Sequence, residues 1–133
     1  MNINDPSALA EMRAAFARYE AALVGNDVAT LDELFWQDER AIRYGTAENL
    51  YGVSQILAFR RQRTPAGLAR DLAGTTITTF GRDFATASTL FSRRTAPGKI
   101  GRQMQTWVRM DGGWRIVAAH ISLIEACGAL TAR

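Results

Sequence analysis

The chain has 133 residues, of which 47% are hydrophobic and 22% charged, and it carries a formal net charge of +3 at pH 7. These values are typical of a globular protein that is large enough to bury a core, so we expect a single domain over residues 1–133. The single cysteine, Cys127, excludes an internal disulfide and any metal site built from several cysteines.

No leader with a basic start and an apolar middle is recognisable, and no apolar run is long enough to span a membrane. Together with the single cysteine, which we expect to be structural, this predicts a cytoplasmic protein without membrane contact. Lys99 is the only lysine, and every other basic residue is arginine. Arginine binds carboxylates bidentately, so the composition is consistent with an anionic small substrate, although arginine-rich codon usage is the simpler explanation. The basic residues form no dense run with interleaved aromatics, so we expect no nucleic acid partner.

The first predicted element is a helix that begins at Asp5 and Pro6, an acidic N-cap followed by a proline in the first turn. Gly25 and Asn26 end it. Tyr19 lies on its apolar stripe, so we expect a buried ring whose hydroxyl needs a partner. The stripe recurs every three or four residues, at Leu9, Met12, Phe16, Tyr19 and Leu23.

Two short elements and a third helix follow. Asp27 caps a short helix, and residues 40–44 read as a strand with Arg43 between two apolar neighbours. The third helix covers 53–63, and its apolar face carries two arginines. This favours the rim of a pocket, although a solvated helix end fits as well. The residues of that face are Ile56, Phe59, Arg60 and Arg63.

From Leu68 onward the apolar pattern has a period of two, which predicts strands over 68–80 and 84–94 and a hairpin over 101–122. The first strand should bend at Gly74. The turn of the hairpin is Asp111-Gly112-Gly113, whose residues tolerate positive φ. In the first arm, Gln103 and Gln105 share a face. In the second arm, strict alternation places His120 on the face of Trp114 and Ile116, which we expect to look inward.

Three helices followed by an antiparallel meander predict an α+β fold. The helices have to cover one face of a curved sheet, and the resulting cone encloses a pocket. No Ser-His-Asp, Cys-His or paired-carboxylate arrangement is legible. We also expect no metal site, because a metal would need His120 together with carboxylates that lie mostly on predicted surfaces.

This order of elements resembles the SnoaL-like, nuclear transport factor two-like superfamily, which has a cystatin-like cone fold. Within it, the chain is similar to the AtzH-like family, which includes the oxalurate-catabolism protein HpxZ. The match covers nearly the whole chain. It is carried by Tyr-Glu-Ala-Ala-Leu at 19–23, Asn-Asp at 26–27, Leu-Phe-Trp at 34–36, Ile-Arg-Tyr-Gly at 42–45, Leu-Tyr-Gly at 50–52, Phe-Arg-Arg-Gln-Arg at 59–63, Thr-Phe-Gly-Arg-Asp-Phe-Ala-Thr at 79–86 and Gly-Arg-Gln at 101–103.

The resemblance implies a cofactor-free, decarboxylating amidohydrolase that converts dicarboxyurea to allophanate in cyanuric acid (s-triazine) breakdown. HpxZ-type relatives belong to oxalurate catabolism. The family's essential pair is a tyrosine of the first helix and an arginine of the strand after the second helix, which correspond to Tyr19 and Arg43. The arginine would bind a carboxylate, and the phenol would donate a hydrogen bond or a proton to the leaving nitrogen.

Each candidate residue also has a purely structural interpretation. Arg43 could form a salt bridge with Asp38, Glu39 or Glu48, and Tyr19 could be an ordinary core residue. The remaining candidates for substrate binding could instead be core, interface or solvent residues. They are His120, Gln103, Gln105, Arg60, Arg63 and Phe59.

Two alternatives to an enzyme remain open at this point. One is a binding or accessory protein of oxalurate catabolism, with an anion pocket but no turnover. The other is a dimeric scaffold for an amidase partner, in which large side chains would fill the interior around Arg43. Cone proteins of this kind commonly pair through the sheet, so we expect a homodimer or a higher homo-oligomer.

Overall fold

The computed structural model describes residues 1–126, so Cys127 and its predicted structural role lie outside the described part of the chain. The elements, in chain order, are α1 (Pro6–Val24), α2 (Val28–Leu34), β1 (Ile42–Tyr44), β2 (Asn49–Tyr51), α3 (Val53–Gln62), β3 (Asp71–Phe80), β4 (Phe84–Ser92), β5 (Lys99–Met110) and β6 (Gly113–Glu125). Within residues 1–126, no helix combines the length and the apolar character that crossing a membrane requires.

Helix α1 begins and ends where the sequence predicts. The Asp5 side chain accepts a hydrogen bond from the backbone N–H of Ala8 at 3.1 Å, and Pro6 occupies the first turn, where no intrahelical donor is needed. At the other end, the N–H of Gly25 donates to the carbonyl of Ala21 at 3.1 Å. The buried face of the helix includes Tyr19, so the predicted burial of its ring is confirmed.

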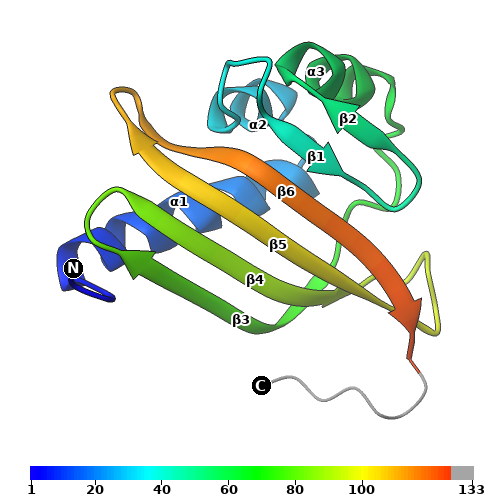
Figure 1. The fold of residues 1–133 in the computed structure, drawn as a ribbon. Helices are drawn as coiled ribbons and strands as arrows, with labels where there is room; N and C mark the ends of the chain where they lie inside the picture. The colour runs from blue at the N-terminus through cyan, green and yellow to red at the C-terminus, as the bar shows by residue number, and fades with distance from the viewer. Residues whose placement is uncertain (127–133) are drawn as a thin grey trace.

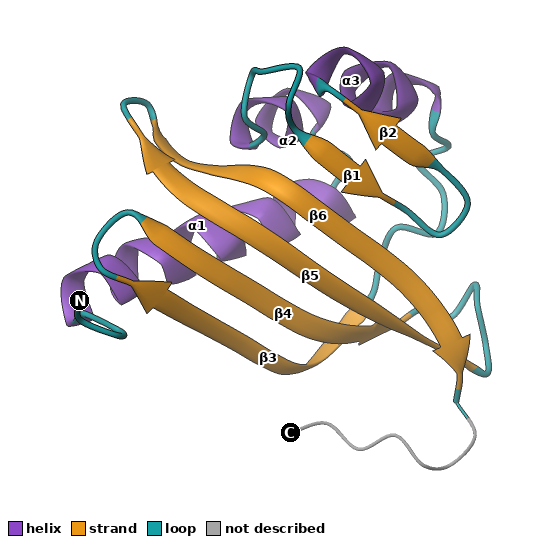
Figure 2. Ribbon diagram, viewed as in Figure 1, coloured by secondary structure: helices purple, strands orange, loops and turns teal. Residues whose placement is uncertain are grey.

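The six strands form one sheet in the order β2-β1-β6-β5-β4-β3 (Figure 1). Strands β3 to β6 form the predicted antiparallel meander, while β1 runs parallel to β6 and antiparallel to β2. Figure 2 shows α1 behind the long strands and α2 and α3 near β1 and β2, and α1 contacts β3 while α2 contacts β6. The α+β cystatin-like cone is thereby confirmed, with one parallel strand pair in an otherwise antiparallel sheet.

Two irregularities curve the sheet. The register of β3 against β4 shifts between Ala73 and Thr76, and Gly74 has a φ of +61°, so the predicted bend is confirmed.

In the hairpin turn between β5 and β6, Gly113 has a positive φ of 120°, whereas Gly112 and Asp111 do not have positive φ. The turn therefore uses the conformational freedom of only one of its three predicted residues.

The second irregularity lies in β6 and changes which of its side chains face the helices. Val117 is an extra residue opposite the step from Thr106 to Trp107 of β5. The alternation of β6 therefore changes phase after Ile116, and His120 is exposed on the face away from the helices. The prediction that His120 looks inward was wrong, because strict alternation takes no account of a bulge. The buried residues of β6 are Trp114, Ile116, Ala119 and Ile121.

Candidate functional site

A cavity of about 230 Å³ lies between the helices and the inner face of the sheet, and we call it the inner cavity. Tyr19 of α1 and Arg43 of β1 both line it, although 24 residues of sequence separate them. Its other charged and amide-bearing lining comes from the segment between β1 and β2, the end of α3, the residue before β3, the residue after β4 and the middle of β5. These residues are Glu48, Arg63, Arg70, Arg93 and Gln103, and Phe59 adds an aromatic face.

Tyr19 is held by aromatic packing and not by a hydrogen bond of its hydroxyl. The residue is 4% exposed, and its ring meets Trp107 edge to face with centroids 6.4 Å apart. The Trp107 indole N–H in turn donates to Gln105 Oε1 at 3.0 Å. No hydrogen bond joins the Tyr19 hydroxyl to another group of residues 1–126, and the side chain lines the inner cavity. A buried phenol in a cavity wall without a protein partner is available to a ligand.

Arg43 forms one of the three salt bridges that the sequence leaves open. Its Nη1 donates to Glu48 Oε2 at 2.8 Å, and its guanidinium lies over the ring of Phe59 at 5.5 Å from the centroid. Gly45 makes room for this pair, because a Cβ at that position would lie 1.6 Å from Glu48 Oε2. Arg43 therefore has both a structural partner and a place in the cavity wall, so the two interpretations of this residue are compatible.

Arg63 and Arg93 differ from Arg43, because no carboxylate pairs with either of them in the described part of the chain. Burial lowers the pKa of the Arg63 guanidinium from its ordinary value, and the neighbouring Arg60 lowers it further. Burial likewise lowers the pKa of Arg93, with Arg70 as the next cause. The folded protein thus holds two cations in an environment that disfavours their charge.

Arg70 and Gln103 are linked to each other. The Arg70 guanidinium binds Glu20 of α1 through two hydrogen bonds, of 2.6 and 3.0 Å, and its Nη2 also donates to Gln103 Oε1 at 3.1 Å. The amide oxygen of Gln103 is thereby engaged, and its buried Nε2 has no acceptor among residues 1–126. The guanidinium carbons of Arg70 and Arg93 lie 4.5 and 4.7 Å from the centroid of the Phe91 ring.

Two of the predicted binding residues lie in the core and not in the cavity wall. Arg60 is 5% exposed, its Nη1 donates to Asp32 Oδ1 at 2.7 Å, and it does not line the inner cavity. Of the two arginines that the sequence places at the rim of a pocket, Arg63 therefore lies in the cavity wall and Arg60 forms a buried ion pair. Gln105 is buried, but its contact is the Trp107 indole, so of the two predicted glutamines only Gln103 lines the cavity.

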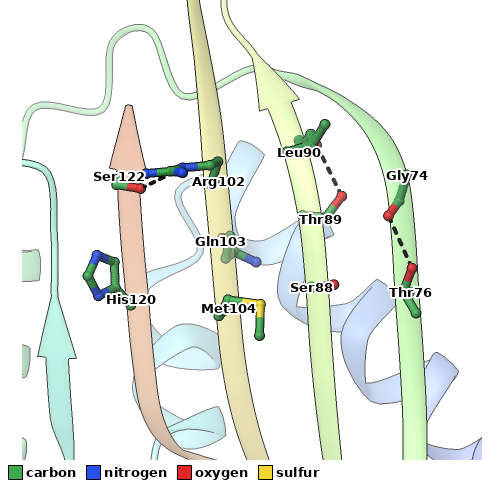
Figure 3. A pocket seen from close by; sticks show the side chains of 10 residues that line it. All are labelled: Gly74, Thr76, Ser88, Thr89, Leu90, Arg102, Gln103, Met104, His120 and Ser122. Atoms are coloured by element: carbon green, nitrogen blue, oxygen red, sulfur yellow. Dashed lines mark hydrogen bonds between the residues drawn. The ribbon is translucent and has the colours of Figure 1, made fainter. Parts of the chain in front are cut away.

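His120 lines a different hollow, on the opposite face of the sheet (Figure 3). This hollow has a volume of about 640 Å³, and its wall includes Met104, Ser88 and Thr76 of the neighbouring strands. The imidazole packs edge to face on Tyr44, with ring centroids 5.9 Å apart. This hollow is larger than the inner cavity and lies on the other face of the sheet, and among its lining residues Gln103 of β5 is shared with the inner cavity.

Sequence reasoning missed Arg70 and Arg93. Arg93 and Arg94 are adjacent, directly after β4, and nothing local distinguishes the half-buried first residue from the exposed second. The alternation of β4 could have indicated Arg93, because odd-numbered positions of this strand, such as Phe91, face inward and residue 93 continues that series. Residues 1–126 contain no group of three or more His, Cys, Asp or Glu side chains that could hold a metal ion.

Comparison with known proteins agrees with the fold. The AtzH-like family model matches residues 1–126. A crystal structure of a protein of unknown function from the DUF3225 family of Pectobacterium atrosepticum shares 61% sequence identity, with a TM-score of 0.90 over 92% of this chain and 95% of that one. A cystatin-like fold protein from Burkholderia xenovorans shares 47% identity, with a TM-score of 0.90 over 94% and 98% of the two chains.

More distant structures support the architecture alone. A putative ketosteroid isomerase from Parabacteroides distasonis shares 15% identity at a TM-score of 0.68, covering 84% of this chain and 86% of that one. At that identity the likeness concerns the fold and not the chemistry. No curated protein matches the chain significantly.

Proposed function

Since this chain belongs to the AtzH-like family, we propose that it is a metal-independent, decarboxylating amidohydrolase that acts on a small carboxylated urea. The substrate is dicarboxyurea and the product is allophanate, as in s-triazine and cyanuric acid catabolism. The observation that carries the proposal is that Tyr19 and Arg43, the pair assigned by resemblance, line one cavity. Its volume of about 230 Å³ lies below the roughly 300–1,000 Å³ of sites for drug-sized ligands, so it suits a small molecule.

The reaction breaks the bond between a urea nitrogen and a carboxylate carbon. The electron pair of that bond stays on the nitrogen, which takes up one proton, and the carbon departs as carbon dioxide, or as bicarbonate if water adds to it first. Both routes need a proton at the leaving nitrogen. The Tyr19 hydroxyl, which has no hydrogen-bond partner within residues 1–126, is the proposed donor.

Arg43 is the proposed anchor for one carboxylate of the substrate. A guanidinium binds a carboxylate with charge-assisted hydrogen bonds, and these are strong in a site that excludes water. Glu48 engages one terminal nitrogen and so limits the orientations of the Arg43 side chain. Phe59 supports the guanidinium from the side. Together these contacts pre-organise the anchor before the substrate binds.

The test is to incubate the purified protein with freshly prepared dicarboxyurea and to follow both carbon dioxide release and allophanate. We expect Tyr19→Phe and Arg43→Ala to lower kcat/KM by at least about 100-fold. The matched controls Tyr51→Phe and Arg40→Ala, at exposed positions, should retain activity. Equal rates with and without protein, or full activity in either cavity variant, would contradict the proposal. Thermal denaturation checks that each variant is folded.

The same experiment separates the two alternatives. Saturable binding of dicarboxyurea or oxalurate without product would favour a binding protein of oxalurate catabolism. A dimeric scaffold for an amidase is less well supported, because the interior around Arg43 contains a cavity and not packed large side chains. A homodimer or higher homo-oligomer is part of the proposal, and analytical ultracentrifugation tests it. A monomer at micromolar concentration would refute that part alone.

A further inference from the structure

The charges around the inner cavity do not balance. Four arginines line it, and two of these have carboxylate partners. Arg63 and Arg93 have none within residues 1–126, and burial lowers the pKa of both guanidinium groups. Both side chains are half-buried, and a cation partly withdrawn from water costs free energy unless a counter-charge accompanies it, so these two guanidinium groups favour an anionic ligand. The paired arginines are Arg43, with Glu48, and Arg70, with Glu20.

The buried polar atoms of the cavity wall that have no hydrogen-bond partner within residues 1–126 are all donors. Nε and Nη2 of Arg63, Nε of Arg93 and Nε2 of Gln103 are buried and have no acceptor in the described part of the chain. Native proteins satisfy nearly all such groups, so a cluster of unsatisfied donors in a cavity wall indicates missing acceptor atoms. Carboxylate oxygens supply acceptors and negative charge together.

Arg63 and Arg93 are each positioned by the end of a secondary-structure element. Arg63 is the residue at which α3 ends, and Arg93 directly follows β4. The Arg93 guanidinium carbon lies 4.7 Å from the centroid of the Phe91 ring, and that ring is 2% exposed. Arg43 and Arg93 both contribute to lowering the pKa of Arg63, so each lies within Coulombic range of the Arg63 guanidinium.

We propose that Arg63 and Arg93 together bind one carboxylate of a dianionic ligand while Arg43 binds the other. The pair makes the site select dianions over monoanions of the same size. The identity of the ligand as a dicarboxylated urea rests on the proposed function, whereas the preference for a dianion rests on the unpaired guanidinium groups.

This arrangement favours release of the product. Dicarboxyurea carries two carboxylates and engages both anchors. When one carboxylate carbon departs, the product keeps a single carboxylate and occupies only one anchor. The second anchor is then without a counter-charge, so the product binds more weakly than the substrate and is released.

The test uses malonate, a stable dianion at pH 8, and its monomethyl ester, a monoanion of similar size. Isothermal titration calorimetry at constant ionic strength should show malonate binding at least about tenfold more tightly than the ester. Arg63→Met and Arg93→Met should each remove at least about tenfold of the malonate affinity and leave the ester nearly unchanged.

Two neighbouring arginines provide matched controls. Arg61→Met and Arg94→Met change the net charge by the same amount at exposed positions, and we expect both to keep the malonate preference. No preference in the wild-type protein, or an equal loss in the control variants, would overturn the proposal. In the absence of ligand, Arg63→Met and Arg93→Met should melt no lower than the wild type, because each removes a half-buried cation that has no carboxylate partner within residues 1–126.

The outcome is independent of turnover. If the wild type leaves dicarboxyurea unchanged but prefers malonate through Arg63 and Arg93, the enzymatic function is wrong and the dianion site stands. If dicarboxyurea is consumed and the two methionine variants keep both the malonate preference and the wild-type KM, the dianion site is wrong and the function stands.

Discussion

Gly101 is a buried glycine of β5 whose missing side chain leaves room for Phe91 of β4, its partner in the sheet. A Cβ at Gly101 would lie 2.1, 2.2 and 2.3 Å from three carbons of the Phe91 ring. Carbons in contact lie about 3.5–4.0 Å apart, so in Gly101→Ala the ring has to move by roughly 1.5 Å or the strands have to separate. Overpacking of this kind costs about 1–3 kcal/mol of the free energy of unfolding.

The displacement should also reach the cavity, because the Arg93 guanidinium lies against the Phe91 ring. We therefore expect Gly101→Ala to lower Tm by about 3–10 °C and to weaken malonate binding. Chemical denaturation and calorimetry measure the two effects. Adding Phe91→Leu should restore part of the stability, because a smaller side chain vacates the space that the new methyl group needs.

Gly112→Ala is the matched control in the turn between β5 and β6. A Cβ there meets mainly the flexible end of the Arg115 side chain, with Nη2 at 2.7 Å, so we expect a change within about 0.5 kcal/mol. The reasoning would be refuted by a Gly101→Ala protein with wild-type stability and wild-type affinity for malonate.

Three further predictions concern residues outside the cavity wall. Asp32→Asn removes the carboxylate partner of the buried Arg60 and should lower the free energy of unfolding by about 2–4 kcal/mol in urea denaturation; a loss below about 0.5 kcal/mol would show that the pair is dispensable. Hydrogen bonds from the Arg40 side chain and backbone lower the pKa of Asp38 from 3.8 to about 2, so this carboxylate stabilises the fold above pH 3.8 and the benefit disappears as the pH falls through about 2. The stability difference between the wild type and Asp38→Asn should accordingly shrink in urea denaturation between pH 4 and pH 2, and a growing difference would contradict this assignment. His120→Ala should keep malonate affinity and dicarboxyurea turnover within about twofold, because His120 lies on the other face of the sheet, whereas a tenfold loss would return it to the site.

Local signals account for most of the fold that could be predicted. Asp5 and Pro6 start α1 and Gly25 ends it, because caps depend on backbone groups only a few residues away. The apolar period of 3.6 places Tyr19 on the buried face, and the period of two identifies the meander. Arg43 lies on β1, within the strand that the sequence predicts over residues 40–44.

What could not be predicted depends on residues that are distant in the sequence. The bulge at Val117 places His120 on the face of the sheet away from the helices, and this bulge is visible only in the pairing of β6 with β5. The choice of Glu48 over two other acids as the partner of Arg43 follows from the pairing of β1 with β2, which brings Tyr44 opposite Asn49.

Sequence by itself indicated the cone architecture, through periodic and capping signals, and the family, through motifs in register along nearly the whole chain. The choice of Tyr19 and Arg43 for the proposed chemistry came from that resemblance. The tertiary structure alone decided which charges are paired. A guanidinium such as Arg93 becomes an uncompensated cation in a cavity only when α1, α3 and the sheet close around it, since burial and counter-charges are properties of the packed molecule and not of any segment.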